Sequence, residues 1–396
     1  MRILWVATKC PWPPADGGRL VLKNTVEALA AAGDDLTVVC PGRRGDSPAP
    51  EGIRLRRVPG EASRAAAAWA ALRLPVAVAR HAWPPLAREA ERAIREGATE
   101  VVFAEQLQAL PACLPALAAA IPVILRAQNV ESDLWSSRAA LAGPAASRFF
   151  RFEAGRLERW EGAAVRRCAA TAALTSRDAG RLRALSGRSA HVTAVPAPFP
   201  ASLPPAEEAL DGNPALAMLA SRGWWANDDG VEWFLREVWP SVRARWDGAR
   251  LHLFGLRPSE ALPPGVSGHE APADSRDAFA PGSIFVVALR AASGVRMKIL
   301  EAWARGAPVV ATPAAAAGLE STEGTLLAAD AGEFVAALES LVGRPDSIRR
   351  LTDFGRRDLA RFHDPAAVAA RLRAIAAEAA GRGHVPASTE DRRSSA

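Results

Sequence analysis

The sequence predicts an α/β protein made of two doubly wound, Rossmann-like domains that face each other across a cleft. Short apolar runs recur along the chain, and longer helical patterns separate them. Such runs are typical of strands that are buried on both faces of a parallel sheet. The repeated order of strand, loop, helix and strand predicts right-handed crossovers, and 396 residues suffice for two domains of ordinary size.

The first domain is expected to span residues 1–196. It opens with a strand over 3–8, a proline-rich loop that contains Gly17 and Gly18, and a helix over 19–32 that ends at Gly33. Further strands are predicted at 36–40, 100–104, 122–126, 169–174 and 191–195, with a long arginine-rich helix around 148–168. This alternation is the pattern of a doubly wound α/β domain.

Residues 197–214 are rich in proline and lack periodicity, so they are expected to link the domains. A second α/β domain is predicted over 215–365, with strands at 215–220, 250–254, 284–288, 308–311 and 325–327, and helices at 230–245, 298–305 and 331–341. A last helix over 366–381 is expected to pack back toward the first domain. The serine-rich, charged tail 382–396 is predicted to be disordered.

Composition limits the partners and the compartment. A net charge of +6 and an isoelectric point near 9.8 favour anionic partners, but 43 acidic residues are mixed among the basic ones, which argues against nucleic acid. The four cysteines are far apart and have no metal-ligand spacing, and no apolar run is long enough to span a membrane. We therefore expect a cytoplasmic protein without metal or cofactor, which could contact the inner face of a membrane peripherally.

The segment from Ser293 to Thr312 is the most informative part of the chain. It predicts a small-residue turn, a short helix, a stop at Gly306 and a strand. The helix N-terminus offers free backbone N–H groups, and Arg296 and Lys298 add two cations there. These cations oppose the helix dipole unless an anion lies between them, so the segment predicts a diphosphate site. An ordinary surface helix with chance charges is the alternative.

The glycine pair Gly17-Gly18 lies between the first strand and the first helix. Glycines at this place let a ligand approach the backbone next to a helix N-terminus, although a tight turn explains the pair about as well. The segment is not the G-x-G-x-x-G pattern of a dinucleotide fold. Together with the turn before Arg296, it favours a phosphorylated ligand.

Several segments in one order resemble a GT-B fold glycosyltransferase of the family 4 type, in its bacterial polysaccharide and sugar-transferase branch. The segments are Pro11–Arg19, Arg126–Ser132, Glu153–Glu161 with Thr175–Asp178, Trp224–Phe234, and Ser293–Thr312 with Ala317–Leu319. The resemblance covers nearly the whole chain, and the segment from Ser293 is its most specific part.

The resemblance implies transfer of a hexose from a nucleotide sugar, which is a co-substrate, to a hydroxyl acceptor on a glycan, a lipid-linked molecule or a small molecule. It implies retention, no metal, a ribose contact by Glu301, and neutralisation of the leaving diphosphate by Arg296 and Lys298. The donor-binding residues that it implies are Gly17, Gly18, Arg222, Ser293, Gly294, Val295, Arg296, Lys298 and Glu301. Contacts to the acceptor or the sugar would come from Glu105, Gln128 and Asn129.

Three positions depart from the family pattern. Ser293 stands where the first of two glutamates is often found, and Gln128 stands where a histidine often touches the sugar. Arg222 lies near the place of a family arginine, but Asn227 stands where a lysine is often found. The departures keep open a non-catalytic sugar-nucleotide-binding or scaffolding protein, and a GT-B-like epimerase is a further alternative.

A few other side chains have two interpretations each. Glu105 could face the cleft or be a solvated loop carboxylate. His81 and His269 are in predicted loops, where they could contact a ligand but are rather expected to be surface residues. Trp233 and Trp239 are expected to pack the core. The arginines of the 148–168 helix could contact an anionic membrane, or form a solvated face with Glu153, Glu158 and Glu161.

Overall fold

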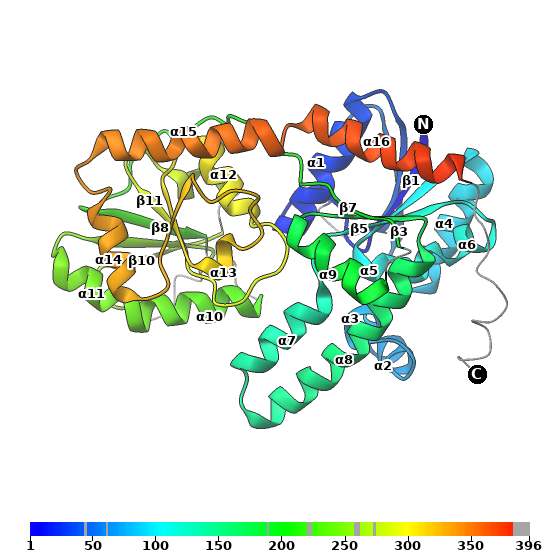
Figure 1. Ribbon diagram of the computed structural model, residues 1–396, viewed down its shortest axis with the longest axis horizontal. Helices are drawn as coiled ribbons and strands as arrows, with labels where there is room; N and C mark the ends of the chain where they lie inside the picture. The colour runs from blue at the N-terminus through cyan, green and yellow to red at the C-terminus, as the bar shows by residue number, and fades with distance from the viewer. Residues whose placement is uncertain are drawn as a thin grey trace. The chain divides into compact units, whose positions relative to one another are not determined.

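The computed structural model describes residues 1–42, 46–60, 62–187, 190–219, 224–256, 262–271 and 275–382. The chain divides into two compact units, Met1–Pro198 with Pro365–Ala396, and Phe199–Asp364. Each unit is built around one parallel sheet, of seven strands in the first and six in the second (Figure 1). The predicted α/β class with two Rossmann-like sheets is confirmed.

The sheet of the first unit has the order β3-β2-β1-β4-β5-β6-β7. Its strands are β1 Arg2–Val6, β2 Asp35–Gly42, β3 Ile53–Pro59, β4 Val101–Glu105, β5 Val123–Ala127, β6 Ala170–Ala173 and β7 Val192–Ala194. The helices are α1 Gly17–Ala31, α2 Arg64–Ala70, α3 Val76–Ala79, α4 Pro84–Gly97, α5 Gln106–Ala109, η1 Leu110–Cys113, α6 Leu114–Ala118, α7 Glu131–Leu141, α8 Pro144–Arg167, α9 Ser176–Ser186 and α16 Pro365–Gly381. Strand β3 was missed because Arg54, Arg56 and Arg57 interrupt its apolar pattern.

Both faces of this sheet are covered. Alternate side chains of each strand point to opposite sides of the sheet, and each set joins a buried cluster. In β1, Leu4 and Val6 join one buried cluster, while Ile3 and Trp5 join another. The second cluster includes Leu372 of α16, which lies along α1 (Figure 1). The last helix is therefore part of the core of the first unit.

The sheet of the second unit has the order β10-β9-β8-β11-β12-β13. Its strands are β8 Ala215–Leu219, β9 Arg250–Phe254, β10 Val266–His269, β11 Ile284–Val287, β12 Val309–Ala311 and β13 Thr325–Leu327. Its helices are α10 Trp225–Trp233, the π-helical turn η2 Phe234–Val238, α11 Trp239–Arg245, the 3₁₀ turn η3 Ser275–Phe279, α12 Met297–Arg305, α13 Pro313–Ala316, α14 Ala331–Glu339 and α15 Pro345–Phe362. Strand β10 and helix α15 were not predicted.

Some boundaries and surroundings differ from the sequence expectations. The helix expected to start at residue 230 starts at Trp225, and His269 ends β10 instead of lying in a surface loop. His269 stacks on Phe254, and one of its ring nitrogens lies 3.0 Å from a ring nitrogen of His252. As expected, Trp239 is buried and Trp233 packs against the core of the second unit.

The structure assigns most of the expected linker to the second unit, whereas most of the expected tail is not described. Phe199 and the residues after it belong to the second unit, where the Phe199 amide donates to the His363 carbonyl. Apart from Arg382, the tail 382–396 lies outside the described residues. Among the described residues, none of the helices has the length and apolarity to cross a membrane.

Candidate active site

The strand order of each sheet defines where a ligand site is expected. In a doubly wound sheet, ligands bind beyond the carboxyl ends of the strands, where the strand order reverses. This switch point lies between β1 and β4 in the first unit, and between β8 and β11 in the second. Most of the side chains singled out from the sequence lie at one of these two places.

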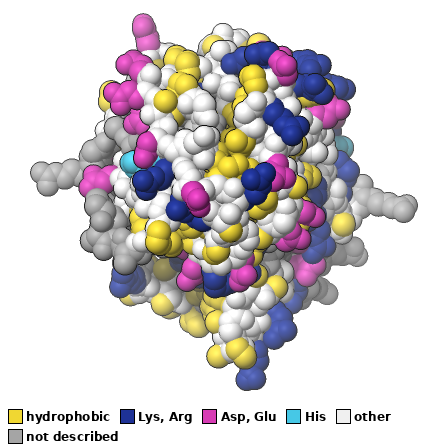
Figure 2. Space-filling model, turned by 90° about the vertical axis from the view of Figure 1, so that its left-hand side faces the viewer, with side chains coloured by type: hydrophobic (Ala, Val, Ile, Leu, Met, Phe, Trp, Pro, Cys, Tyr) yellow, Lys and Arg dark blue, Asp and Glu magenta, His cyan; other side chains and the backbone are white. Residues whose placement is uncertain are grey.

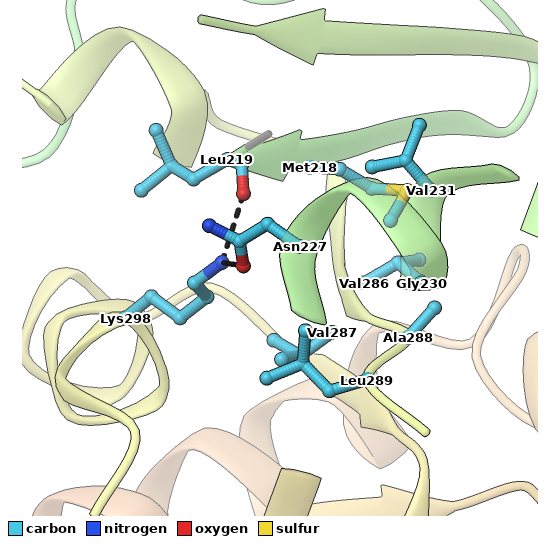
Figure 3. A pocket seen from close by; sticks show the side chains of 10 residues that line it. All are labelled: Met218, Leu219, Asn227, Gly230, Val231, Val286, Val287, Ala288, Leu289 and Lys298. Carbon is cyan, nitrogen blue, oxygen red and sulfur yellow. Dashed lines mark hydrogen bonds between the residues drawn. The ribbon is translucent and has the colours of Figure 1, made fainter. Parts of the chain in front are cut away.

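In the second unit, Lys298 lies at the switch point. It is in the first turn of α12, and its Nζ donates to the Leu219 carbonyl at the end of β8 (2.8 Å) and to Asn227 Oδ1 of α10 (3.1 Å; Figure 3). The acceptors that the described residues offer this ammonium group, a backbone carbonyl and a side-chain amide, are uncharged. Burial, and then the nearby Arg296, lower the pKa of Lys298 to about 7.

The pocket around Lys298 is closely packed. It is lined by residues of β8, α10 and β11 and holds about 10 Å³, room for about one water molecule (Figure 3). Helix α10 reaches the end of β11 because residue 230 is glycine: a Cβ there would lie 2.3 Å from the Ala288 carbonyl oxygen. The packing fixes Asn227, and Asn227 in turn fixes Lys298.

The turn before α12 has a backbone that favours glycine. Gly294 has φ = 70°, and a Cβ on Gly318 would lie 2.1 Å from the Gly294 carbonyl oxygen. Ser293 is half-buried and Val295 is buried, and a guanidinium nitrogen of Arg296 donates to the Ser293 carbonyl. The Arg296 guanidinium also lies 5.4 Å from the ring centroid of Trp224. Backbone and cation thus meet at the start of the helix.

Glu301 lies one turn further along α12 and is buried. Its Oε1 accepts hydrogen bonds from Ser275 Oγ (2.5 Å) and from Arg305 Nε (3.0 Å). The Glu301 and Arg305 side chains are 9% and 8% exposed, so this is a buried ion pair. Sequence reasoning missed both partners, although the four-residue spacing from Glu301 to Arg305 was a visible signal. Arg222, the remaining residue expected in this unit, lies outside the described residues.

Trp303, on the buried face of α12, fixes this helix against its neighbours. Trp303 Nε1 donates to the Gly324 carbonyl (2.8 Å), and a Cβ on Gly355 of α15 would lie 2.5 Å from the Trp303 ring. The indole therefore packs directly on the backbone of α15. This contact fixes the helix that carries Lys298 and Glu301.

In the first unit, Glu105 lies at the switch point and is buried, which corrects its interpretation as a solvated loop carboxylate. Its two oxygens accept from Trp5 Nε1 (2.7 Å) and from Gln128 Nε2 (2.5 Å). Burial raises the pKa of Glu105 to about 7 against the opposing effects of Arg126, Gln128 and Trp5. No sequence pattern indicates the Trp5 contact, because it joins residues a hundred positions apart.

Gln128 connects Glu105 to the glycine pair. Its Nε2 also donates to the Gly18 carbonyl (3.0 Å), and its Oε1 accepts from Gln106 Nε2 (2.7 Å). A Cβ on Gly18 would lie 3.0 Å from Gln128 Oε1, so the glycine leaves room for this side chain. Gly17 and Gly18 begin α1, which Asp16 caps by accepting from the Arg19 amide.

Asn129 follows Gln128 in the chain. Together with Gln108 it hydrogen-bonds the buried Glu131, and burial raises the pKa of that carboxyl group. Arg126, the register partner of Glu105 on β5, is buried and donates to the carbonyl groups of Val195 (2.5 Å) and Pro196 (2.9 Å). No role for Arg126 was expected from the sequence.

Two of the three helix carboxylates expected to form a solvated face with the arginines of α8 are buried instead. Glu153 accepts from the Val76 amide and pairs with Arg156, both at 2.7 Å. Glu161 accepts from the amides of Glu131 and Ser132 at the start of α7. These carboxylates fasten neighbouring elements to α8, and only Glu158 of the three is exposed.

Two sequence families match the chain. The family described as "Glycosyl transferases group 1" matches residues 214–344, and the family described as "Glycosyl transferase 4-like domain" matches residues 16–198. The chain belongs to the family 4 type of GT-B glycosyltransferases. It is accordingly a glycosyltransferase enzyme.

Solved structures share its fold. Sucrose-phosphate synthase from Thermosynechococcus elongatus has a TM-score of 0.70 at 14% identity, over 97% of this chain and 100% of the other. HepE from Anabaena, solved with UDP and glucose, has a TM-score of 0.67 at 12% identity, over 96% and 100%. WaaG, a glycosyltransferase involved in lipopolysaccharide biosynthesis, has a TM-score of 0.63 at 13% identity, over 94% and 99%. No match was found among curated protein sequences.

Proposed function

We propose that this glycosyltransferase moves a hexose from a nucleotide diphosphate sugar to a hydroxyl acceptor, with retention and without a metal ion. The observation that carries the proposal is Lys298, whose ammonium is hydrogen-bonded to the neutral oxygens of Leu219 and Asn227 at the switch point of the second sheet. A half-buried cation whose described hydrogen-bond acceptors are neutral gains from an anionic ligand. HepE, which shares the fold, has been solved with UDP-glucose.

In this proposal Lys298 and Arg296 neutralise the diphosphate as it leaves. The bond between the anomeric carbon and the diphosphate oxygen breaks, and the acceptor oxygen bonds to that carbon on the same face. The acceptor proton goes to the departing diphosphate oxygen, so no protein nucleophile is needed. The negative charge on the diphosphate grows in the transition state, where two nearby cations stabilise it most.

The other donor contacts are assigned by position. The backbone of Ser293, Gly294 and Val295 faces the diphosphate or the sugar, and Glu301 accepts from the ribose hydroxyl groups. Arg305 and Ser275 hold the Glu301 carboxylate through one oxygen, Oε1, which orients it. In the first unit, Gly17, Gly18, Glu105, Gln128 and Asn129 are assigned to the sugar or the acceptor.

The decisive measurement is binding of a panel of nucleoside diphosphates by calorimetry, followed by turnover with the matching nucleotide sugar. We expect one nucleotide to bind, and Lys298→Met to lower kcat by roughly a hundredfold, more than it weakens donor binding. Lys23→Met is the matched control, because Lys23 is on α1 and pairs with Glu27. A Lys298→Met enzyme with unchanged kcat and weaker binding would contradict the role at the leaving group. No binding by any nucleotide would overturn the donor assignment.

A further inference from the structure

The first unit exposes large apolar side chains on two segments that are distant in sequence. Trp69 of α2 is 67% exposed and Leu72, just after this helix, is 79% exposed. On α8, Phe149 is 48% exposed and Phe152 is 64% exposed. We call these four residues and the arginines around them the α2–α8 surface. Clustered exposed apolar side chains of this size mark interaction sites.

Partly buried polar contacts fasten the two segments to each other. Arg156 of α8 donates to the carbonyl groups of Ala71 and Leu74, each at 2.8 Å, and pairs with the buried Glu153. Glu153 also accepts from the Val76 amide, so one ion pair holds the whole turn after α2. Figure 1 shows α2 and α3 beside α8. The α2–α8 surface is therefore a fixed feature of the fold.

The charge on this surface has one sign. The segments 62–80 and 141–152 contain no Asp or Glu, although the chain has 43 acidic residues. Their five charged side chains are all exposed arginines: Arg64, Arg73, Arg80, Arg148 and Arg151. The guanidinium of Arg73 lies 5.5 Å from the Trp69 ring centroid, which keeps charge and aromatic ring together.

The turn between α7 and α8 is also apolar and basic. It lies at the lower end of the first unit in Figure 1, and the lower tip in Figure 2 carries hydrophobic and basic side chains. Beside it, a hollow of about 520 Å³ is lined by small residues such as Ala139 and Ala142 and bordered by Arg151. An arginine at the edge of an apolar hollow fits a phosphate group attached to hydrocarbon.

We propose that the α2–α8 surface docks the enzyme on a bilayer that contains anionic phospholipids. Trp and Phe side chains insert at the level of the headgroups, while the arginines stay with the lipid phosphates. A second copy of this chain fits less well, because a twofold contact would bring the same arginines against each other. The docking requires no ligand in the donor site.

Vesicle sedimentation tests the proposal with the full chain. We expect binding to phosphatidylcholine vesicles that contain phosphatidylglycerol, weakened by salt, and little binding to phosphatidylcholine alone. The loss should be roughly fivefold for each of Arg73→Ala and Arg148→Ala. Trp69→Ala with Phe152→Ala should weaken binding further. Arg350→Ala and Leu327→Ala, at exposed positions of the second unit, are the matched controls.

Circular dichroism melting curves check that the variants remain folded, which is expected because every replaced side chain is exposed. Folded surface variants that bind anionic vesicles like the wild type would overturn the proposal. Equal binding to both vesicle types would overturn it as well. So would a wild-type dimer that fails to bind vesicles and that Trp69→Ala dissociates, because the surface would then be an interface between two copies.

Discussion

Glu105 in the first unit and Lys298 in the second lie at equivalent places, the switch point of a parallel sheet, but they carry opposite charges. Both pKa values are shifted to about 7, upward for the acid and downward for the base, with burial as the largest cause. Both side chains are hydrogen-bonded to uncharged groups: an indole and an amide for Glu105, a backbone carbonyl and an amide for Lys298.

The difference lies in what each arrangement leaves for a ligand. Glu105 has both oxygens occupied and Arg126 nearby, so its network is complete within the first unit. Among the described residues, the oxygens that accept from Lys298 carry no negative charge, so an incoming anion adds an ionic interaction to these hydrogen bonds. Lys298 is therefore suited to interact with an anionic group, whereas Glu105 belongs to a hydrogen-bond network with Trp5 and Gln128.

The largest effect is expected from removing one partner of the Glu301–Arg305 ion pair in α12. Glu301→Ala leaves the buried Arg305 guanidinium without its carboxylate, which should lower the free energy of unfolding by about 3 kcal/mol. Urea denaturation measures this change. The double variant Glu301→Ala with Arg305→Ala should recover part of the loss. A double variant whose loss equals the sum of the losses of Glu301→Ala and Arg305→Ala would show that the pair is not coupled.

The pH dependence of nucleotide binding sharpens the assignment of Lys298. An anion raises the pKa of this ammonium group, so binding takes up a proton above pH 7 and affinity falls by up to about tenfold per pH unit there. Calorimetry with UDP-glucose from pH 6 to pH 9, expressed as the ratio of wild type to Lys298→Met, isolates this effect. A flat ratio would mean that Lys298 does not interact with the ligand.

The pH dependence of stability tests Glu105 in the same way. Its pKa is near 4.5 when unfolded and about 7 when folded, so the folded state keeps a proton that the unfolded state loses. The free energy of unfolding should therefore fall as pH rises from about 4.5 to 7, by up to about 1.4 kcal/mol per unit. Glu105→Gln should reduce this slope. Glu161→Gln is a useful comparison, because burial also raises the pKa of Glu161 to about 7; an unchanged slope in Glu105→Gln would place the titration elsewhere.

The smallest effect is expected from Gly18→Ala. The new Cβ would lie 3.0 Å from Gln128 Oε1, the mobile end of a side chain that can shift by a few tenths of an ångström. We expect a loss of less than about 1 kcal/mol in the free energy of unfolding and a weaker pH effect of Glu105. Gly17→Ala is the neighbouring control at the same helix start. A much larger loss in Gly18→Ala would show that the Gln128 network is rigid.

Much of the fold could be predicted because buried parallel strands have nearly continuous apolar sequences. The predicted strands include β9 and β13 with their observed bounds, and the cluster of Ser293, Arg296 and Lys298 was recognised from neighbouring residues. Strand β3, at the sheet edge, was missed because arginines, two of them exposed, interrupt its apolar pattern, and the four residues of β10 are only half-buried. Periodicity does not identify strands of this kind.

By itself, the sequence determined the two α/β units, the glycine turns and the cations at the start of α12, because these depend on residues close together in the chain. Only the tertiary structure decided the partners. It brought Leu219 and Asn227 to Lys298, Trp5 and Gln128 to Glu105, and Arg156 to the turn after α2. Each of these contacts joins residues that the folding of a sheet or helix brings together from afar. Burial then set the pKa values, since desolvation depends on the packing around a side chain and leaves no local pattern in the sequence.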